Sequence, residues 1–594
     1  MRKEIRPDGN LITRLFFRLL PIQILLCAIG AVNSTISSLF ASNHIGAAAM
    51  SAIGIYNPIN MFVNAMTSLL VLGATIICGK FMGAQQMEKT QSVFSMDILV
   101  SVLFSGITIA LHLMAVAFGW MWLFTKDQEV YMYLNQYVLG RAIGILPFVL
   151  GQQLAAFLSL ENRRVRTTVA SVVFLVVNLV ANYVFVAVLK MQAFGIALAS
   201  SVGLVIFFGI ELSHYFSKSA MMKLRFKGMA IKDLGDIFKT GFPCALGDGY
   251  QAIRGLIVNT LLTMYAGSMG ISAYTTALTF MGLFWAIPGA MMNVTRMLMS
   301  VSVGEQDRQT LTDVMRNMYR WCIPIMVVIA GILTVLAVPI TKLYYKDPTQ
   351  DVFMMTVWGI RLMPVVMPLA LPSMAAFAYG QASGKQGLVN VLSAFDGVVG
   401  VVLFSLILMP SMSLNGLYLA IILNSVAAGI FIVYGYSVIR NRRLPRNMDE
   451  FMVIPAGFGV SDKDRMDVSV RSMEDVVRVS AKVSAFCREK GIDERRSYLA
   501  GLFLEEMAGN VVDHGFRKDR KKHSVDIRVV HKDDDLILRI KDDCKPFDPM
   551  ERKDIMDPED PMKNIGIRMV YAMASKTDHR NLLGLNVLTL TLSK

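Results

Sequence analysis

The chain has 594 residues, of which 54% are hydrophobic and only 17% are charged, so most of it is not built to be surrounded by water. Its length exceeds that of one compact core, which favours several structural units. The net charge of +14 comes largely from short loops between apolar runs, a pattern of membrane topology that argues against a nucleic-acid partner. The six cysteines are far apart and contain no CxxC pair, so nothing indicates a disulfide framework or a zinc site.

The first part of the chain consists of apolar runs that are long enough to cross a bilayer, about 20 residues each. The basic segment before them lacks a small-residue cleavage site, so we expect it to be retained in the cytoplasm. We predict twelve membrane-spanning helices, and hence an all-α polytopic membrane protein. The runs lie near residues 15–40, 50–78, 93–118, 131–157, 167–189, 193–215, 236–264, 272–303, 318–343, 353–381, 388–411 and 415–439.

Basic residues divide the connecting loops into two alternating sets. Lysines and arginines occur near residues 80–89, 163–166, 218–227, 308–316 and 385. The alternate loops near 41–47, 265–271 and 412–414 contain neither residue type. The positive-inside rule therefore predicts that the first set and both termini lie in the cytoplasm.

The two halves of the apolar region resemble each other. Three pairs of landmarks are separated by 221 or 222 residues: Pro21 and Pro243, Gly83 and Gly304, and Glu161 and Ser383. A constant offset predicts two six-helix lobes arranged as parallel repeats. Such repeats enclose a substrate site at their interface, near the middle of the bilayer.

The order of several motifs resembles the multidrug and toxic compound extrusion (MATE) transporters. These motifs are "SNHIGAAAMSAIG" after the first run, a "GA-Q" loop after the second, and "VVNLVANYVFV" in the fifth. The resemblance covers about residues 12–440. It implies secondary active export of bulky organic compounds, often cations, by antiport against Na⁺ or H⁺.

Ionisable groups inside apolar runs are candidates for ion or substrate binding because burying them in a membrane is costly. The predicted set is Asp248 and Arg254 in the seventh run, Asp396 in the eleventh and Arg141 in the fourth. Asp248 and Arg254 are six residues apart, so they do not share a helix face. Each group can either bind an ion or substrate or form a structural ion pair with another helix.

Three asparagines mark a departure from the family pattern in the first lobe. MATE transporters often have an aspartate in the first span and another in the fifth, four residues after an asparagine. This chain has Asn33 at the first position, and it has Asn178 followed by Asn182 at the second. An amide oxygen can coordinate a cation but cannot take up a proton. We therefore expect the C-lobe acids to carry any proton coupling, and the amides either to bind an ion or to join helices by hydrogen bonds.

The composition becomes that of a soluble protein after about residue 440. The predicted organisation is a cytoplasmic N-terminus (1–14), an N-lobe (15–217), an inter-lobe loop (218–234), a C-lobe (235–440), a basic linker (441–460) and a C-terminal domain (461–594). Within that domain we predict helices over 473–490, 494–514 and 564–575, and strands over 523–532, 535–543 and 584–594.

Three motifs of the C-terminal domain resemble the ATP-binding fold shared by histidine kinases, Hsp90 and gyrase, in its anti-sigma-factor serine-kinase subgroup. They are "EEMAGNVVDHG" on a helix, "KDDCKPFDP" after a strand, and "NIGIRMV" at a helix start. The resemblance spans about residues 460–594 and implies an α/β two-layer sandwich that binds ATP and Mg²⁺.

The resemblance also implies roles for individual residues. Asn510 would hold the magnesium ion, and Glu506 would be the general base. Asp542 would accept a hydrogen bond from the adenine amino group, and Gly566 would let backbone amides approach phosphate. His514, in the same helix motif, either caps and packs or reacts.

Two residues depart from the nucleotide-binding pattern. Cys544 stands where the turn normally has glycine, and Asn564 stands where the second box has its first glycine. Either side chain would crowd the nucleotide or stiffen the lid. The sequence leaves open whether the domain hydrolyses ATP.

Two functional hypotheses follow. The preferred one is a MATE-like, ion-coupled exporter in the inner (plasma) membrane, with a cytoplasmic ATP-binding domain that regulates transport. The alternative is a membrane sensor whose kinase-like domain binds or phosphorylates a cytoplasmic anti-sigma-antagonist-like protein. A lipid or lipid-linked oligosaccharide flippase would share the helical pattern. The absence of a "GxxxxGK[ST]" loop argues against the domain as a transport motor.

Overall fold

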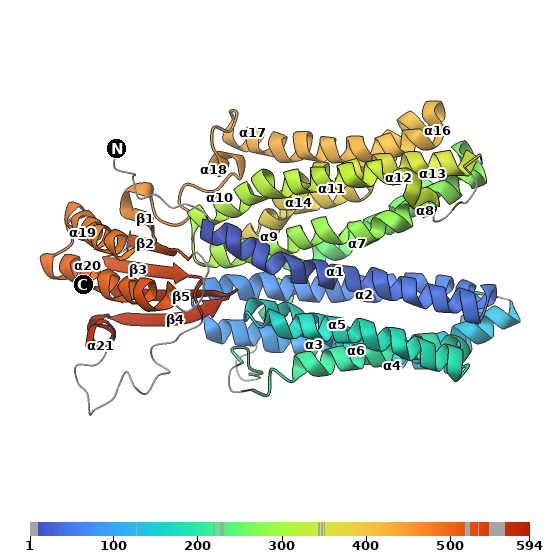
Figure 1. Cartoon of the computed structure of the whole chain (residues 1–594), viewed down its shortest axis with the longest axis horizontal. Coiled ribbons are helices and arrows are strands. Elements are labelled where there is room, and N and C mark those ends of the chain that lie inside the picture. Colours follow the sequence, from blue (N-terminus) through green and yellow to red (C-terminus); the bar gives the residue numbers. More distant parts are fainter. Residues whose placement is uncertain are drawn as a thin grey trace.

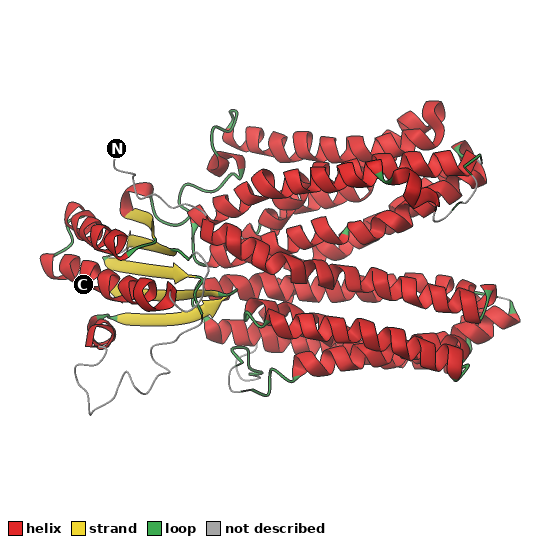
Figure 2. Cartoon of the chain, viewed as in Figure 1, coloured by secondary structure: helices red, strands yellow, loops and turns green. Residues whose placement is uncertain are grey.

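A computed structural model describes residues 10–125, 127–217, 220–225, 231–342, 345, 348–349, 351–516, 523–532, 534–545 and 565–594. The molecule consists of a long helical bundle with a small α/β domain at one end (Figures 1 and 2). We call this the domain end of the bundle. The C-terminus lies in the small domain, and α1 begins beside it (Figure 1).

The helices divide by chain order into two halves. The N-half contains α1 (Asn10–His44), α2 (Ala47–Gly83), α3 (Met87–Ala117), η1 (Trp120–Leu123), α4 (Gln128–Leu160), α5 (Arg164–Asn182), η2 (Tyr183–Val188) and α6 (Gln192–Leu212). The C-half contains α7 (Ile231–Tyr265), α8 (Gly267–Phe284), α9 (Ala286–Gly304), α10 (Arg308–Asn317), η3 (Met318–Cys322), α11 (Ile323–Val335), α12 (Ala337–Lys342), α13 (Asp351–Leu362), η4 (Met363–Val365), α14 (Val366–Ser383), α15 (Gln386–Ala394), η5 (Phe395–Val399), α16 (Gly400–Ala427), η6 (Ala428–Tyr434) and α17 (Gly435–Asn441).

The described residues contain nine helical segments that are long and apolar enough to cross a membrane, or ten if the bent pair α8–α9 is one span. Helix α7 is not among them, and residues Gln386–Asn441 count as one segment although Ser413 has non-helical backbone angles. Adding α7 and dividing that segment at Ser413 would give the predicted twelve. The twelve spans and the two-lobe arrangement therefore remain predictions.

The two halves meet near the domain end through glycines. A methyl group on Gly241 of α7 would lie 2.0 Å from the backbone oxygen of Leu69 on α2. A methyl group on Gly73 of α2 would lie 2.2 Å from the backbone oxygen of Ile237 on α7. Small residues allow helix backbones to approach this closely. The N-half and C-half are therefore packed backbone to backbone at this end.

The small domain contains one antiparallel sheet in the order β1-β2-β3-β5-β4. The strands are β1 (Arg465–Val470), β2 (Val525–Lys532), β3 (Asp535–Asp542), β4 (Lys576–Leu582) and β5 (Leu585–Leu592). The helices of this part are α18 (Met448–Phe451), η7 (Asp462–Asp464), α19 (Met473–Glu489), α20 (Glu494–Asn510), η8 (Val511–Gly515) and α21 (Ile565–Met573). The predicted α/β sandwich thus has β1 and β4 in addition to the strands expected from sequence.

Apolar and polar side chains alternate along strands such as β2 and β3, so the sheet has two different faces. Residues such as Val468, Ile527 and Leu538 form a core with α19, α20 and α21. Among the described residues, no helix of the domain covers the other face, which carries charged side chains such as Asp467, Arg528 and Lys541. Hydrophobic burial therefore explains one layer of the sandwich, and the charged face needs a different partner.

We predict that Gly241→Ala destabilises the bundle, because its new methyl group meets a backbone atom that cannot move aside. Overpacking of this kind costs roughly 1–3 kcal/mol. Gly255→Ala on the same helix is the matched control, since a methyl group there has nothing within 4 Å. Thermal unfolding in detergent should show a lower melting temperature for Gly241→Ala only. Equal melting of the two variants would contradict the close approach of α2 and α7.

Candidate functional site

The structure brings together Glu506 and Gly566, which are 60 positions apart. Glu506 lies on α20, and Gly566 lies in the first turn of α21. A methyl group on Gly566 would lie 1.8 Å from the Glu506 Oε2 atom. Only glycine therefore lets the start of α21 lie directly against this carboxylate. The first turn of a helix stabilises nearby negative charge, which suits both this carboxylate and a phosphate group.

Asp542 is buried at the end of β3, as the motif requires. Its Oδ1 atom accepts hydrogen bonds from the Cys544 backbone N–H at 3.0 Å and from the Asn586 side-chain amide at 2.8 Å. Burial raises the pKa of Asp542, and the Asn586 hydrogen bond opposes that rise. Asn586, on the neighbouring strand β5, was not predicted from sequence and holds the adenine-site candidate in place.

The other candidates of the nucleotide motif are arranged around the end of α20. Asn510 is half-buried and is the last residue of that helix, directly before the π-helical segment η8. His514 falls within η8, its side chain is 70% exposed, and its Nδ1 lies 3.7 Å from Asp513 Oδ2. Cys544 is buried, with its sulfur 3.1 Å from where a methyl group on Gly515 would lie. Asn564 lies outside the described residues.

These residues fit the chemistry of ATP with Mg²⁺. Asn510 supplies an amide oxygen, which is a ligand type that Mg²⁺ accepts. Asp542 supplies a buried carboxyl oxygen, and the Gly566 backbone leaves room for close approach. The Cys544 sulfur is turned toward Gly515, so the residue that replaces glycine in this turn is accommodated inside the domain.

The charged face of the sheet docks on the loop between α9 and α10 in the C-half. Lys541 Nζ lies 2.5 Å from Glu305 Oε2 and 3.0 Å from Asp307 Oδ2, and Arg528 Nη2 lies 2.6 Å from Asp307 Oδ1. All four side chains are at most 11% exposed. Because each buried charge has a partner of opposite sign, removing one member would leave another uncompensated.

Asp307 is the centre of this cluster, and it also caps α10 by accepting from Thr310 N at 2.8 Å. Burial alone would raise its pKa, but Arg528 and Lys541 outweigh burial and hold the pKa of Asp307 well below its usual range. With a depressed pKa, Asp307 contributes to docking at every pH above about 4, and the contribution is lost as the pH falls through the lowered value.

The same domain also contacts the N-half. The β4–β5 hairpin reaches the end of α4, where Leu583 N donates to Leu160 O at 3.3 Å and the Asn162 amide donates to Asn581 Oδ1 at 2.9 Å. At the start of α1, Arg14 Nε lies 3.1 Å from Asp543 Oδ2. The sheet and the residues that adjoin its strands therefore contact both halves of the bundle (Figure 1).

Within the N-half, the three predicted asparagines lie close together. Ser200 of α6 donates to Asn33 Oδ1 at 3.1 Å and accepts from the Asn178 amide at 3.3 Å. The Asn182 amide donates to the Asn178 backbone oxygen at 2.8 Å. These bonds join α1, α5 and α6, which is the hydrogen-bonding alternative considered from sequence.

Of the candidates in the C-half, Asp396 and Arg254 lie in contact with each other. Asp396 Oδ1 accepts from the Asn424 amide at 2.7 Å, and Arg254 Nη1 donates to the Asp396 backbone oxygen at 3.4 Å. Asp248 lies in α7, but its side chain is outside the described part of the structure. Arg141, in the N-half, donates to Asn60 Oδ1 at 3.0 Å.

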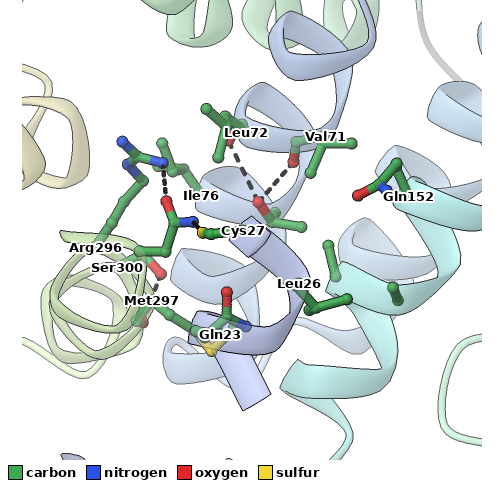
Figure 3. Close-up of a pocket in the computed structure, with 14 residues that line it drawn as sticks. Gln23, Leu26, Cys27, Val71, Leu72, Ile76, Gln152, Arg296, Met297 and Ser300 are labelled. Atoms are coloured by element: carbon green, nitrogen blue, oxygen red, sulfur yellow. Dashed lines mark hydrogen bonds between the residues drawn. The ribbon is translucent and has the colours of Figure 1, made fainter. Parts of the chain in front are cut away.

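A cavity of about 240 Å³ lies between the two halves. It is lined from α1, α2, α4 and α9, with polar side chains that include Gln23, Gln152 and Arg296 (Figure 3). Arg296 Nη1 donates to Asn293 Oδ1 at 3.1 Å, and the Asn293 amide donates to the Cys27 sulfur at 3.5 Å. A mostly apolar cavity with a few polar groups is the usual form of a small-molecule site.

Two buried acids within the predicted apolar runs were missed from sequence. Asp97 on α3 and Glu211 on α6 are both 0% exposed. Each is a single acid within an apolar run, so the rule that selected Asp396 would also have selected them.

Comparison with known proteins finds a separate match for each of the two parts of the chain. Residues 24–184 match the MatE family model, and residues 471–592 match the model for the histidine kinase-like ATPase domain. The chain therefore has a MatE-type region near its N-terminus and a histidine kinase-like ATPase domain at its C-terminal end. Comparison with curated protein sequences finds no significant match.

Solved structures of MATE transporters share the fold of the bundle. A MATE structure in complex with MaL6 has a TM-score of 0.65 at 18% identity, covering 72% of this chain and 95% of that one. An outward-facing multidrug resistance MATE transporter of the MOP superfamily has a TM-score of 0.64 at 18% identity, covering 72% and 97%. A MOP superfamily transporter from Pyrococcus furiosus has a TM-score of 0.63 at 18% identity, covering 72% and 96%.

We predict that Asn586→Ala destabilises the ATPase-like domain by about 1–3 kcal/mol, because buried Asp542 loses a hydrogen-bond donor. The loss should be greater at pH 7.5 than at pH 5.5, since the raised pKa of Asp542 makes its ionised form the costly one. Asn586→Asp should be worse, because it adds a second carboxyl group beside the first. Limited proteolysis of the whole chain at both pH values measures this, and unchanged digestion of both variants would contradict it.

Proposed function

We propose that this protein is an ion-coupled exporter of small organic compounds, and that its ATPase-like domain binds ATP and regulates transport. It would lie in the inner (plasma) membrane with the ATPase-like domain and both termini in the cytoplasm. The observation that carries this proposal is the docking of one sheet on both halves of a MATE-type bundle. The cavity between the halves is the candidate substrate site. Its Arg296 gives no support to the expectation of a cationic substrate, so we propose the organic class without that restriction.

The ATP site would use the residues that surround α20 and the end of β3. Mg²⁺ bound to the nucleotide would neutralise negative charge on the nucleotide phosphates. Asn510 would hold the magnesium ion, Asp542 would orient the adenine, and the start of α21 at Gly566 would receive the phosphates in the space beside Glu506. Glu506 would then be the general base for any phosphoryl transfer.

Regulation would operate through the docked sheet. Lys541, which pairs with Glu305 and Asp307, directly precedes Asp542 on β3. A change at the adenine site is therefore one residue away from the buried ion pairs. Export by alternating access requires the two halves to move against each other. A sheet bound to both halves stabilises one arrangement, and ATP shifts the equilibrium to the extent that it binds the two arrangements differently.

The docking also bears on the alternative of a sensor that phosphorylates a soluble anti-sigma-antagonist-like partner. In this structure the charged sheet face and the β4–β5 hairpin contact the bundle, so their partner is part of the same chain. This favours regulation of the bundle over signalling to a separate protein.

Glu506→Gln is expected to lower any ATP hydrolysis by the purified protein at least about 100-fold, because general-base catalysis contributes about 10²–10⁴-fold. The neighbouring Glu505 is exposed and serves as the matched control. Glu505→Gln should hydrolyse ATP like the unmodified protein. If the unmodified protein binds ATP without hydrolysing it, a fluorescent ATP analogue should still bind. Lack of binding would contradict the proposed ATP site.

Asp307→Asn is expected to abolish the effect of ATP on transport. Asparagine can still cap α10, but Lys541 and Arg528 each lose one charged partner and keep only Glu305 and Asp467 respectively. Breaking a buried pair costs about 3–5 kcal/mol. Asp313→Asn is the control, because the partners of Asp313 among the described residues, Gln309 and Arg316, both lie within one turn of it on α10. Uptake of a fluorescent dye into proteoliposomes, with and without ATP, measures the effect. Retained ATP dependence in Asp307→Asn would refute regulation through this contact.

A further inference from the structure

Helix α3 has a continuous buried polar stripe that the proposed substrate and ATP sites do not use. It consists of Asp97, Ser101, Ser105, Thr108 and His112, and every one of these side chains is at most 7% exposed. Their spacing of four, four, three and four residues places them on one face of the helix. The stripe spans about 22 Å at 1.5 Å per residue, most of a hydrocarbon core about 30 Å thick.

Asp97 is at the end of the stripe nearer the ATPase-like domain and is completely buried. Neither of its carboxyl oxygens has a hydrogen-bond partner in the described part of the structure. Gln153 contacts the stripe from the neighbouring helix α4, where its side-chain amide donates to Ser101 Oγ at 3.1 Å. The Gln153 Oε1 atom also lacks a hydrogen-bond partner among the described residues. Burying an unpaired carboxylate costs several kcal/mol, so this group is stable in its buried position as the neutral acid.

Among the described residues, the charged and titratable groups near Asp97 do not supply a counter-charge. The Cys78 thiol of α2 carries no positive charge and donates to the Thr90 backbone oxygen at 3.6 Å. Asp233 of α7 accepts a hydrogen bond from Ser92 at 2.6 Å. Arg225, in the segment that packs beside this end of α3, is paired with exposed Glu88 at 3.0 Å. Uptake of a proton is therefore the simplest way to neutralise Asp97.

His112 is at the other end of the stripe and is part of a second polar group. Its Nδ1 lies 2.8 Å from the Thr108 backbone oxygen, so Nδ1 carries a hydrogen, and its Nε2 lies 2.9 Å from the Tyr56 hydroxyl. The titratable neighbours on this side are Tyr56, Tyr137 and Arg141. Nε2 can accept a second proton if the Tyr56 hydroxyl turns to accept from it.

We propose that the buried face of α3 is a proton pathway, with Asp97 as the residue that binds the coupling proton and His112 as the relay at the far end. This inference rests on the proposed export function. The proton bonds to a carboxyl oxygen of Asp97 from one side of the membrane and leaves that oxygen for the other side, so no redox partner is involved. The pathway places proton coupling in the N-half, although Asn33 and Asn182 replace the acids expected there.

The first test uses dicyclohexylcarbodiimide, which adds covalently to protonated carboxyl groups in apolar surroundings. The full-length protein in liposomes is treated at pH 6, 7 and 8, and the modified peptides are identified by mass spectrometry. We expect modification of Asp97 that decreases as the pH rises. Asp97 that stays unmodified at every pH would overturn the inference whatever the transport result.

The second test measures ethidium transport in proteoliposomes under an imposed proton or sodium gradient. Asp97→Asn mimics the neutral acid and should fold, but it should reduce proton-driven transport at least 10-fold. Asp97→Glu should restore part of it, and Glu88→Gln, an exposed position on the same helix, should have no effect. Elution of each variant as a single peak in detergent checks folding.

The outcomes separate this inference from the proposed function. Transport that is driven by sodium alone, or by protons equally well in Asp97→Asn, overturns the pathway and leaves the exporter intact. No ethidium movement with either gradient in the unmodified protein counts against the exporter, and the pathway then falls with it.

Discussion

The buried pairing of Asp307 with Lys541 and Arg528 is the interaction on which the arrangement of the two parts depends. The ATPase-like domain has a sheet with one apolar face and one charged face, and only the apolar face is covered by its own helices. Charges at most 11% exposed need partners, and the α9–α10 loop supplies them from the bundle. The charged face of the sheet is thus covered by the helical bundle, which is why the two parts form one structure instead of two tethered ones.

The contact between the two halves of the bundle indicates what the Asp307 pairing contributes to function. Near the domain end, α2 and α7 touch at backbone level through Gly73 and Gly241, while the same end carries the docked sheet. Both features stabilise close approach of the halves on that side. An exporter that alternates must loosen these contacts in part of its cycle. Under the proposed function, ATP bound next to Lys541 would shift the balance between the two arrangements.

Much of this could be predicted from sequence, and the gaps have physical causes. The apolar runs and the helix that carries Glu506 and Asn510 follow from local periodicity. The two family models match the corresponding parts of the chain. Strand β4 was missed because "KTDHRNL" has no apolar alternation, since its place in the sheet is decided by pairing with β5. Glu305 and Asp307 carry no local sequence signal for docking, because their partners lie more than 200 residues further along the chain. Asp542 was predicted, but Asn586, which holds it, carries no local signal.

The most direct test of the account is the distance of the ATPase-like domain from each half of the bundle. Spin labels at Glu494 and Glu88 report on the domain and the N-half, and labels at Glu494 and Arg316 report on the domain and the C-half. In a full-length chain with its own cysteines replaced, pulsed electron paramagnetic resonance should give one narrow distance for each pair without nucleotide. A broad distribution for either pair would show that the domain is tethered without docking, and it would contradict the account.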